Sequence, residues 1–97
     1  MRETPNQFRV LVSRDGRDGS VRVHQDATLS GAWLTAGAEL VQLLARDRQY
    51  WLQVAEGSIR ANGQPLAAGD GLALTGAGKL ELSATEGAEV LLFDLAR

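Results

Sequence analysis

The sequence predicts a single all-β domain, either a sandwich or a barrel. Its 97 residues suit one domain of ordinary size. Short runs of alternating apolar and polar residues recur along the chain, and turn signals separate them at intervals of roughly 8–12 residues. Most of the 11 glycines fall between these runs. With 44% hydrophobic and 23% charged residues, the composition is that of a globular protein rather than a disordered or fibrous one.

The first two strands are expected on either side of an Asp/Gly-rich turn. Residues 8–12 alternate and lead into a turn at residues 13–19, and residues 21–25 alternate again. We interpret the turn as a charged hairpin turn between these strands. Residues 1–7 are polar, and we expect them to be a loose lead-in to the domain.

Further strands are predicted at residues 27–34, 39–44, 50–55, 58–61, 72–74 and 79–83. Asn62-Gly63 is the strongest hairpin signal, because a type I′ turn needs a positive φ at both residues. Gly69-Asp70-Gly71 marks another turn. Residues 36–46 also fit a short amphipathic helix, but the β context favours a strand. The nearly continuous apolar run at residues 89–95 is typical of a strand in the middle of a sheet.

The composition excludes several classes of function. The net charge is −2 and the chain has no cluster of basic residues, which argues against nucleic-acid binding. The chain has no cysteine, which excludes disulfides and thiolate chemistry, and its one histidine, His24, is too little for a histidine metal site. It shows neither a signal peptide nor an apolar run approaching the ~18 residues of a membrane span. We therefore expect a cytoplasmic protein that binds neither nucleic acid nor membranes.

A series of short motifs points to a family. They are Asp15-Gly16-Arg17-Asp18-Gly19-Ser20, His24-Gln25-Asp26-Ala27, Trp51-Leu52-Gln53-Val54, Gly57, Asn62-Gly63, Leu66, Gly69-Asp70-Gly71 and Glu89-Val90-Leu91-Leu92-Phe93-Asp94-Leu95. In this order and spacing, the chain resembles the C-terminal cupin domain of pirin-like bicupin proteins of the bacterial quercetinase type. The resemblance implies a cupin-type β-sandwich, or jelly roll, over residues 1–97. It also implies that the chain corresponds to the second half of a two-domain protein whose N-terminal cupin holds the metal.

The resemblance indicates where a metal would lie in a cupin. The first metal-binding motif reads G-x5-H-x-H-x(3,4)-E-x6-G and aligns on Gly37 and Gly57, and the second motif aligns on Gly69. The four ligand positions then fall on Leu43, Ala45, Tyr50 and Leu72. Leucine and alanine have no lone pair to donate, and a neutral tyrosine is a poor ligand. We therefore expect neither a metal nor another cofactor in this chain, and a divalent metal such as iron would belong to the N-terminal cupin.

Other candidate residues have ordinary structural explanations. His24, with Asp26 nearby, has the chemistry of a general base, but no second motif supplies the rest of a catalytic site. We interpret it as a histidine on the outer or edge face of a strand. The loop at residues 15–19 is a poor calcium loop, because Arg17 stands where a ligand is needed. The segment Arg46-Asp47-Arg48 is interpreted as a solvated turn.

The large aromatic residues Trp33, Tyr50 and Trp51 raise the question of a pocket. Adjacent residues of a regular strand point to opposite faces, so only one of Tyr50 and Trp51 faces the interior. The motif alignment places Tyr50 inside, where it and the neighbouring ligand positions Leu43 and Leu72 would line an apolar pocket. Packing in the core or at an interface is the favoured explanation for the aromatic residues.

Two functions of different class remain open. The favoured one is a non-catalytic, metal-free cupin module of a pirin-like protein, packing against a catalytic cupin whose family activity is quercetin 2,3-dioxygenation. The alternative is a stand-alone cupin, or a metal-free enzyme, that binds a small apolar ligand at the barrel mouth around Tyr50. We also expect self-association as a homodimer, in part because the strand at residues 8–12 is expected to have an unpaired edge.

Overall fold

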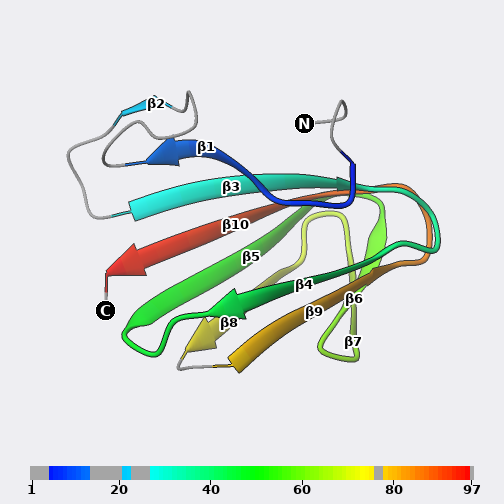
Figure 1. The fold of residues 1–97 in the computed structure, drawn as a ribbon. Helices are drawn as coiled ribbons and strands as arrows, with labels where there is room; N and C mark the ends of the chain where they lie inside the picture. Colours follow the sequence, from blue (N-terminus) through cyan, green and yellow to red (C-terminus); the bar gives the residue numbers. More distant parts are fainter. Residues whose placement is uncertain (1–4, 14–20, 23–26, 76–77, 97) are drawn as a thin grey trace.

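The computed structural model is a sandwich of two β-sheets, which confirms the predicted fold class (Figure 1). It describes residues 5–13, 21–22, 27–75 and 78–96. The strands within these ranges are β1 (Arg9–Ser13), β2 (Val21–Arg22), β3 (Ala27–Leu34), β4 (Glu39–Leu44), β5 (Arg48–Glu56), β6 (Ser58–Ala61), β7 (Gln64–Ala67), β8 (Gly71–Thr75), β9 (Gly78–Ala84) and β10 (Ala88–Ala96). No helix in the described ranges is long and apolar enough to cross a membrane.

Strand β10 lies in the middle of the larger sheet, as its apolar sequence predicts. Within the described residues this large sheet has the order β2-β1-β3-β10-β5-β8, and the small sheet has the order β4-β9-β6-β7. Strand β10 pairs antiparallel with β3 from Ala88↔Leu34 to Leu95↔Ala27. It also pairs antiparallel with β5, so both of its edges carry ladder hydrogen bonds along most of its length.

The core fills the space between the two sheets. Its largest fully buried side chains are Leu34, Leu52, Ile59, Leu80, Val54 and Val90, which come from strands of both sheets. In β5 the burial alternates residue by residue, so Leu52 and Val54 face inward while Trp51 faces outward. This two-residue period is the ordinary geometry of a strand with one face in the core.

The Asn62-Gly63 hairpin forms as predicted. Strands β6 and β7 pair antiparallel, with Ala61 opposite Gln64 across the two-residue turn. Both turn residues have a positive φ, of 49° at Asn62 and 82° at Gly63. The Asn62 side chain also accepts a hydrogen bond from the Glu81 backbone N–H at 2.7 Å, which fastens the turn to β9.

The N-terminal strands differ from the predicted hairpin. Strands β1 and β2 pair in parallel, with Val12 opposite Val21, whereas a tight hairpin turn would join antiparallel strands. Strand β1 pairs with β3 along one edge, and on its other edge β2 pairs only with Val12 and Ser13, so among the described residues the expected unpaired edge is covered at its end alone. Asn6, within the expected loose lead-in, donates its backbone N–H to the Trp33 carbonyl at 2.7 Å. Its side chain accepts a hydrogen bond from the Thr35 N–H at 3.0 Å.

Gly57 provides a test of the close packing between the strand ends. Its φ is +80°, and a Cβ built on it would overlap the Gly87 carbonyl oxygen and lie 2.8 Å from the Ala88 Cα. Gly37 has a similar φ of +82°, but a Cβ there would meet nothing within 4 Å. We expect Gly57→Ala to lower the free energy of unfolding by about 3–4 kcal/mol, because left-handed strain and overpacking add.

The matched control is Gly37→Ala, which introduces the strain without the overlap and should cost about 1–2 kcal/mol. Urea unfolding followed by tryptophan fluorescence measures both variants. Equal losses in the two variants would show that the strand ends are not closely packed at Gly57.

Candidate functional site

A hollow of about 260 Å³, which we call the mouth, lies at one end of the sandwich. Its apolar lining residues are Phe8, Val10, Leu43, Ala45 and Leu92, and its polar lining residues are Thr28, Ser30, Gln42, Tyr50 and Asp94. Half of the lining is therefore polar, although the sequence had predicted an apolar pocket.

The mouth is polar because the inward-facing residues of several strands pass from apolar in the core to polar at this end. In β3 the inward positions run from Leu34 and Ala32, which are fully buried, to Ser30 at the mouth. In β10 the same change occurs between the buried Val90 and Asp94. Inward positions of a sandwich are ordinarily apolar, so a group of polar side chains from several strands at one end marks a candidate binding site.

Tyr50 is the most deeply placed polar residue of the mouth. Only 7% of it is exposed, whereas its neighbour Trp51 is 41% exposed on the opposite face, as the strand alternation predicts. The Tyr50 hydroxyl oxygen accepts a hydrogen bond from the Ala45 backbone N–H at 2.8 Å. This bond fastens the loop between β4 and β5 to the inside of the sandwich.

An ion pair borders the mouth. Arg48 Nε donates to Asp94 Oδ1 at 2.6 Å, and Arg48 Nη2 donates to the Asp94 carbonyl oxygen at 3.3 Å. The two side chains are 18% and 33% exposed. Arg48 is therefore the first residue of β5 and a partner of β10, which corrects its assignment to a solvated turn; Arg46 and Asp47 do occupy an exposed turn.

Three of the four positions aligned with cupin ligands, Leu43, Ala45 and Tyr50, line the mouth, and Leu72 does not. Leu43 is 71% exposed, because the burial of β4 alternates so that Leu40, Gln42 and Leu44 face inward. Leu72 is partly buried against the core beside Leu52, outside the mouth. The expected pocket of Tyr50, Leu43 and Leu72 therefore needs correction: Tyr50 and Leu43 line the mouth, and Leu72 does not.

These positions do not fit a metal ion chemically. Ala45 and the two leucines offer no donor side chain, and the hydroxyl oxygen of Tyr50 already accepts a hydrogen bond. Among the described residues, no three side chains of histidine, cysteine, aspartate or glutamate gather as metal ligands would. His24, Asp26 and the loop at residues 15–19 lie outside the described residues.

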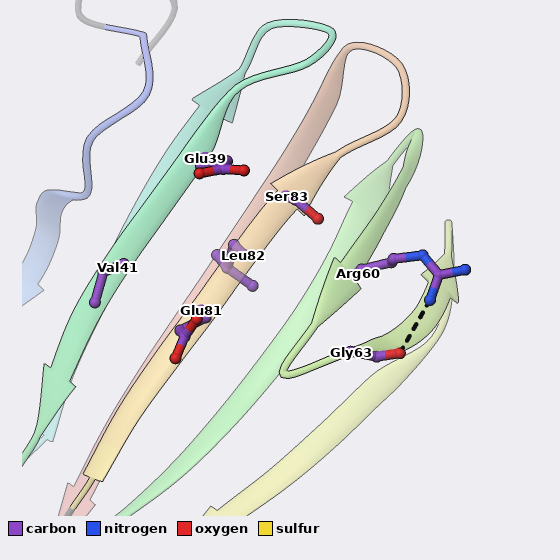
Figure 2. Close-up of a pocket in the computed structure, with 7 residues that line it drawn as sticks. All are labelled: Glu39, Val41, Arg60, Gly63, Glu81, Leu82 and Ser83. Carbon is purple, nitrogen blue, oxygen red and sulfur yellow. Dashed lines mark hydrogen bonds between the residues drawn. The ribbon is translucent and has the colours of Figure 1, made fainter.

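A second, shallower hollow of about 200 Å³ lies on the outer face of the small sheet (Figure 2). Its lining residues are Glu39, Val41, Arg60, Gly63, Glu81, Leu82 and Ser83. Arg60 Nη1 donates to the Gly63 carbonyl oxygen at 3.1 Å, which turns the guanidinium toward the hairpin. The sequence did not single out this hollow, because its residues meet only through the pairing of β4, β9 and β6.

The outer face of the large sheet carries an apolar row. The register places Leu29, Phe93, Trp51 and Ala73 side by side across β3, β10, β5 and β8. Two further apolar residues of β10 share this face, Leu91 and Leu95, of which Leu95 is 37% exposed. The Trp51 ring lies over Gly71, where a Cβ would overlap it. An outer sheet face is usually polar, so this row resembles an interface.

Comparison with known proteins places this geometry in a family. Residues 10–95 match the quercetinase C-terminal cupin domain. The chain belongs to the quercetinase C-terminal cupin family. This confirms the resemblance and the cupin fold predicted from the sequence motifs.

Two relatives and one crystal structure describe the family further. The chain is 38% identical over 86 residues to a quercetin 2,3-dioxygenase of Escherichia coli K12, covering 89% of this chain and 37% of the relative. It is 35% identical over 74 residues to a pirin-like protein of Caulobacter vibrioides, covering 76% and 32%. The crystal structure of the bacterial pirin YhhW from Escherichia coli, in complex with nickel(II), superposes with a TM-score of 0.89 at 35% identity, covering 96% and 41%. The quercetinase C-terminal cupin thus spans about two fifths or less of these proteins.

The donor chemistry of this quercetinase C-terminal cupin predicts that it does not hold a transition metal. After incubation with nickel(II) or iron(II) and gel filtration, elemental analysis should find far less than one metal ion per chain, because three of the four aligned positions have no donor atom. The nickel-binding pirin of Escherichia coli is the positive control. About one tightly held ion per chain would contradict the prediction.

Proposed function

We propose that this chain is a non-catalytic, metal-free cupin module that packs against a catalytic cupin through the outer face of its large sheet. The catalytic partner would carry out the quercetin 2,3-dioxygenation for which the relatives are named. The chain itself would support that partner and shape its surroundings.

The observation that carries this proposal is the apolar row Leu29, Phe93, Trp51 and Ala73. Apolar surface that stays exposed is unfavourable in water, at roughly 25 cal/mol for each Å². A partner that covers the row removes this cost. Aromatic anchors such as Trp51 and Phe93 are typical of the centre of an interface.

The coverage of the relatives supports the same proposal. The quercetin 2,3-dioxygenase of Escherichia coli K12 has more than half of its length outside the matched region. A second domain in that remaining portion is a partner of suitable size, since contacts between domains of one chain bury about 600–1,500 Å².

Split-protein complementation tests the proposal. The portion of the Escherichia coli quercetin 2,3-dioxygenase that the chain does not match is produced together with this chain, and copurification and quercetin consumption are measured. We expect a soluble, active complex with the wild-type chain. Trp51→Asp should abolish both, because it places a charge in the centre of the apolar row.

Val41→Asp is the matched control. Val41 is also exposed, at 55%, but it lies on the outer face of the small sheet. This variant should keep the complex and its activity. Equal loss in both variants, or quercetin consumption by the chain alone, would contradict the proposal.

Without a partner, the same face should drive self-association. We expect sedimentation equilibrium to give a mass that rises above the 10.4 kDa of one chain toward that of a two-fold dimer with increasing concentration. Trp51→Asp should return the chain to a monomer, and Val41→Asp should leave the association unchanged. A constant mass near 10.4 kDa for the wild-type chain from micromolar to near-millimolar concentration would contradict this prediction.

A further inference from the structure

We propose that the mouth binds a neutral, single-ring compound carrying two or more hydroxyl groups. The proposal concerns the interior of the sandwich and goes beyond the packing role of the outer face. The proposal is based on the hydrogen-bonding capacity, the charge and the size of the mouth.

Polar side chains of the mouth retain unused hydrogen-bonding capacity. The Tyr50 oxygen accepts from Ala45, and among the described residues its own proton has no acceptor. Ser30 makes no side-chain hydrogen bond within those residues. Gln42 donates its amide N–H to the Leu43 carbonyl at 3.1 Å, and its side-chain oxygen accepts no hydrogen bond from the part of the chain that the structure describes. The mouth therefore offers both donors and acceptors, which is what a hydroxyl group requires.

The charge of the mouth favours a neutral ligand. Asp94 is the one acidic residue among the described residues that line it, and no basic residue is among them. Arg48 pairs with that carboxylate at 2.6 Å, so the mouth carries no uncompensated charge from this pair. An anion would find no free cation there and would approach a carboxylate, while a cation would have to compete with Arg48.

The size and the walls favour a single ring. At about 260 Å³, the mouth is smaller than the ~300–1,000 Å³ of sites for drug-sized molecules. Phe8, just before β1, and Val10 and Leu92, on β1 and β10, supply apolar surface next to the polar group. A flat or chair-shaped ring can place its faces on these walls while its hydroxyl groups reach Tyr50 and Ser30.

The test ligand is resorcinol (1,3-dihydroxybenzene), which is added to the full-length chain. We expect it to bind in NMR titration, with the largest amide shifts at Ser30, Ala45 and Tyr50. Tyr50→Phe should weaken binding about 3- to 10-fold, because it removes one hydrogen bond. Val10→Trp should abolish binding by filling the mouth while keeping the Tyr50 hydroxyl. Ser83→Ala, which removes a hydroxyl from the outer hollow, is the matched control and should bind as the wild type does.

Ligands of the same size test the chemical class. Myo-inositol, a neutral ring with hydroxyl groups, should shift the same amides, whereas benzoate and benzylammonium should bind at least 10-fold more weakly than resorcinol. The proposal is overturned if resorcinol causes no shifts at the mouth at tens of millimolar. It is also overturned if Val10→Trp folds and binds as the wild type does, or if either charged ring binds as tightly as resorcinol.

Discussion

Strand β10 is apolar on both faces, and the rest of the structure depends on this. Its inward residues Val90 and Leu92 fill the core, and its outward residues Leu91 and Phe93 lie on the outer face of the large sheet. β10 pairs with β3 on one edge and with β5 on the other. Its register with these two strands therefore decides which residues of all three face inward and which face outward. The small sheet covers the inward face. The outward face is apolar as well, and it is the face that we propose packs against the catalytic cupin.

Alternation and apolar runs predicted most of the strands, β4 and β10 among them, but they did not show which face of β4 points inward. In β4, Leu40, Val41, Leu43 and Leu44 surround a single glutamine, so the sequence does not show which set faces inward. The motif alignment placed Leu43 inside, while the structure leaves it 71% exposed. The parallel pairing of β1 with β2 was also out of reach, because it involves two residues of β2 and no local turn geometry.

The mouth could not be predicted for a different reason. Its polar residues belong to four strands, and Ser30, Gln42 and Asp94 are far apart in the sequence. Taken singly, each looks like a surface residue of an alternating strand. Only the register of the sheets shows that they share an inward-facing end. Arg48 was misassigned for the same reason, because its partner Asp94 lies 46 residues away.

The hydrogen bond between Ala45 and Tyr50 joins two of the positions that align with cupin metal ligands, and both residues line the proposed ligand site. The motif alignment assigns both residues to positions that a metal would join in a cupin with the full ligand set. In this chain the same two positions are joined directly, N–H to hydroxyl oxygen, at 2.8 Å. A single hydrogen bond contributes only about 1 kcal/mol net, but it fixes the loop between β4 and β5 without an ion. The bond occupies a lone pair of the Tyr50 hydroxyl oxygen and does not use the hydroxyl proton, so Tyr50 can still donate to a molecule in the mouth.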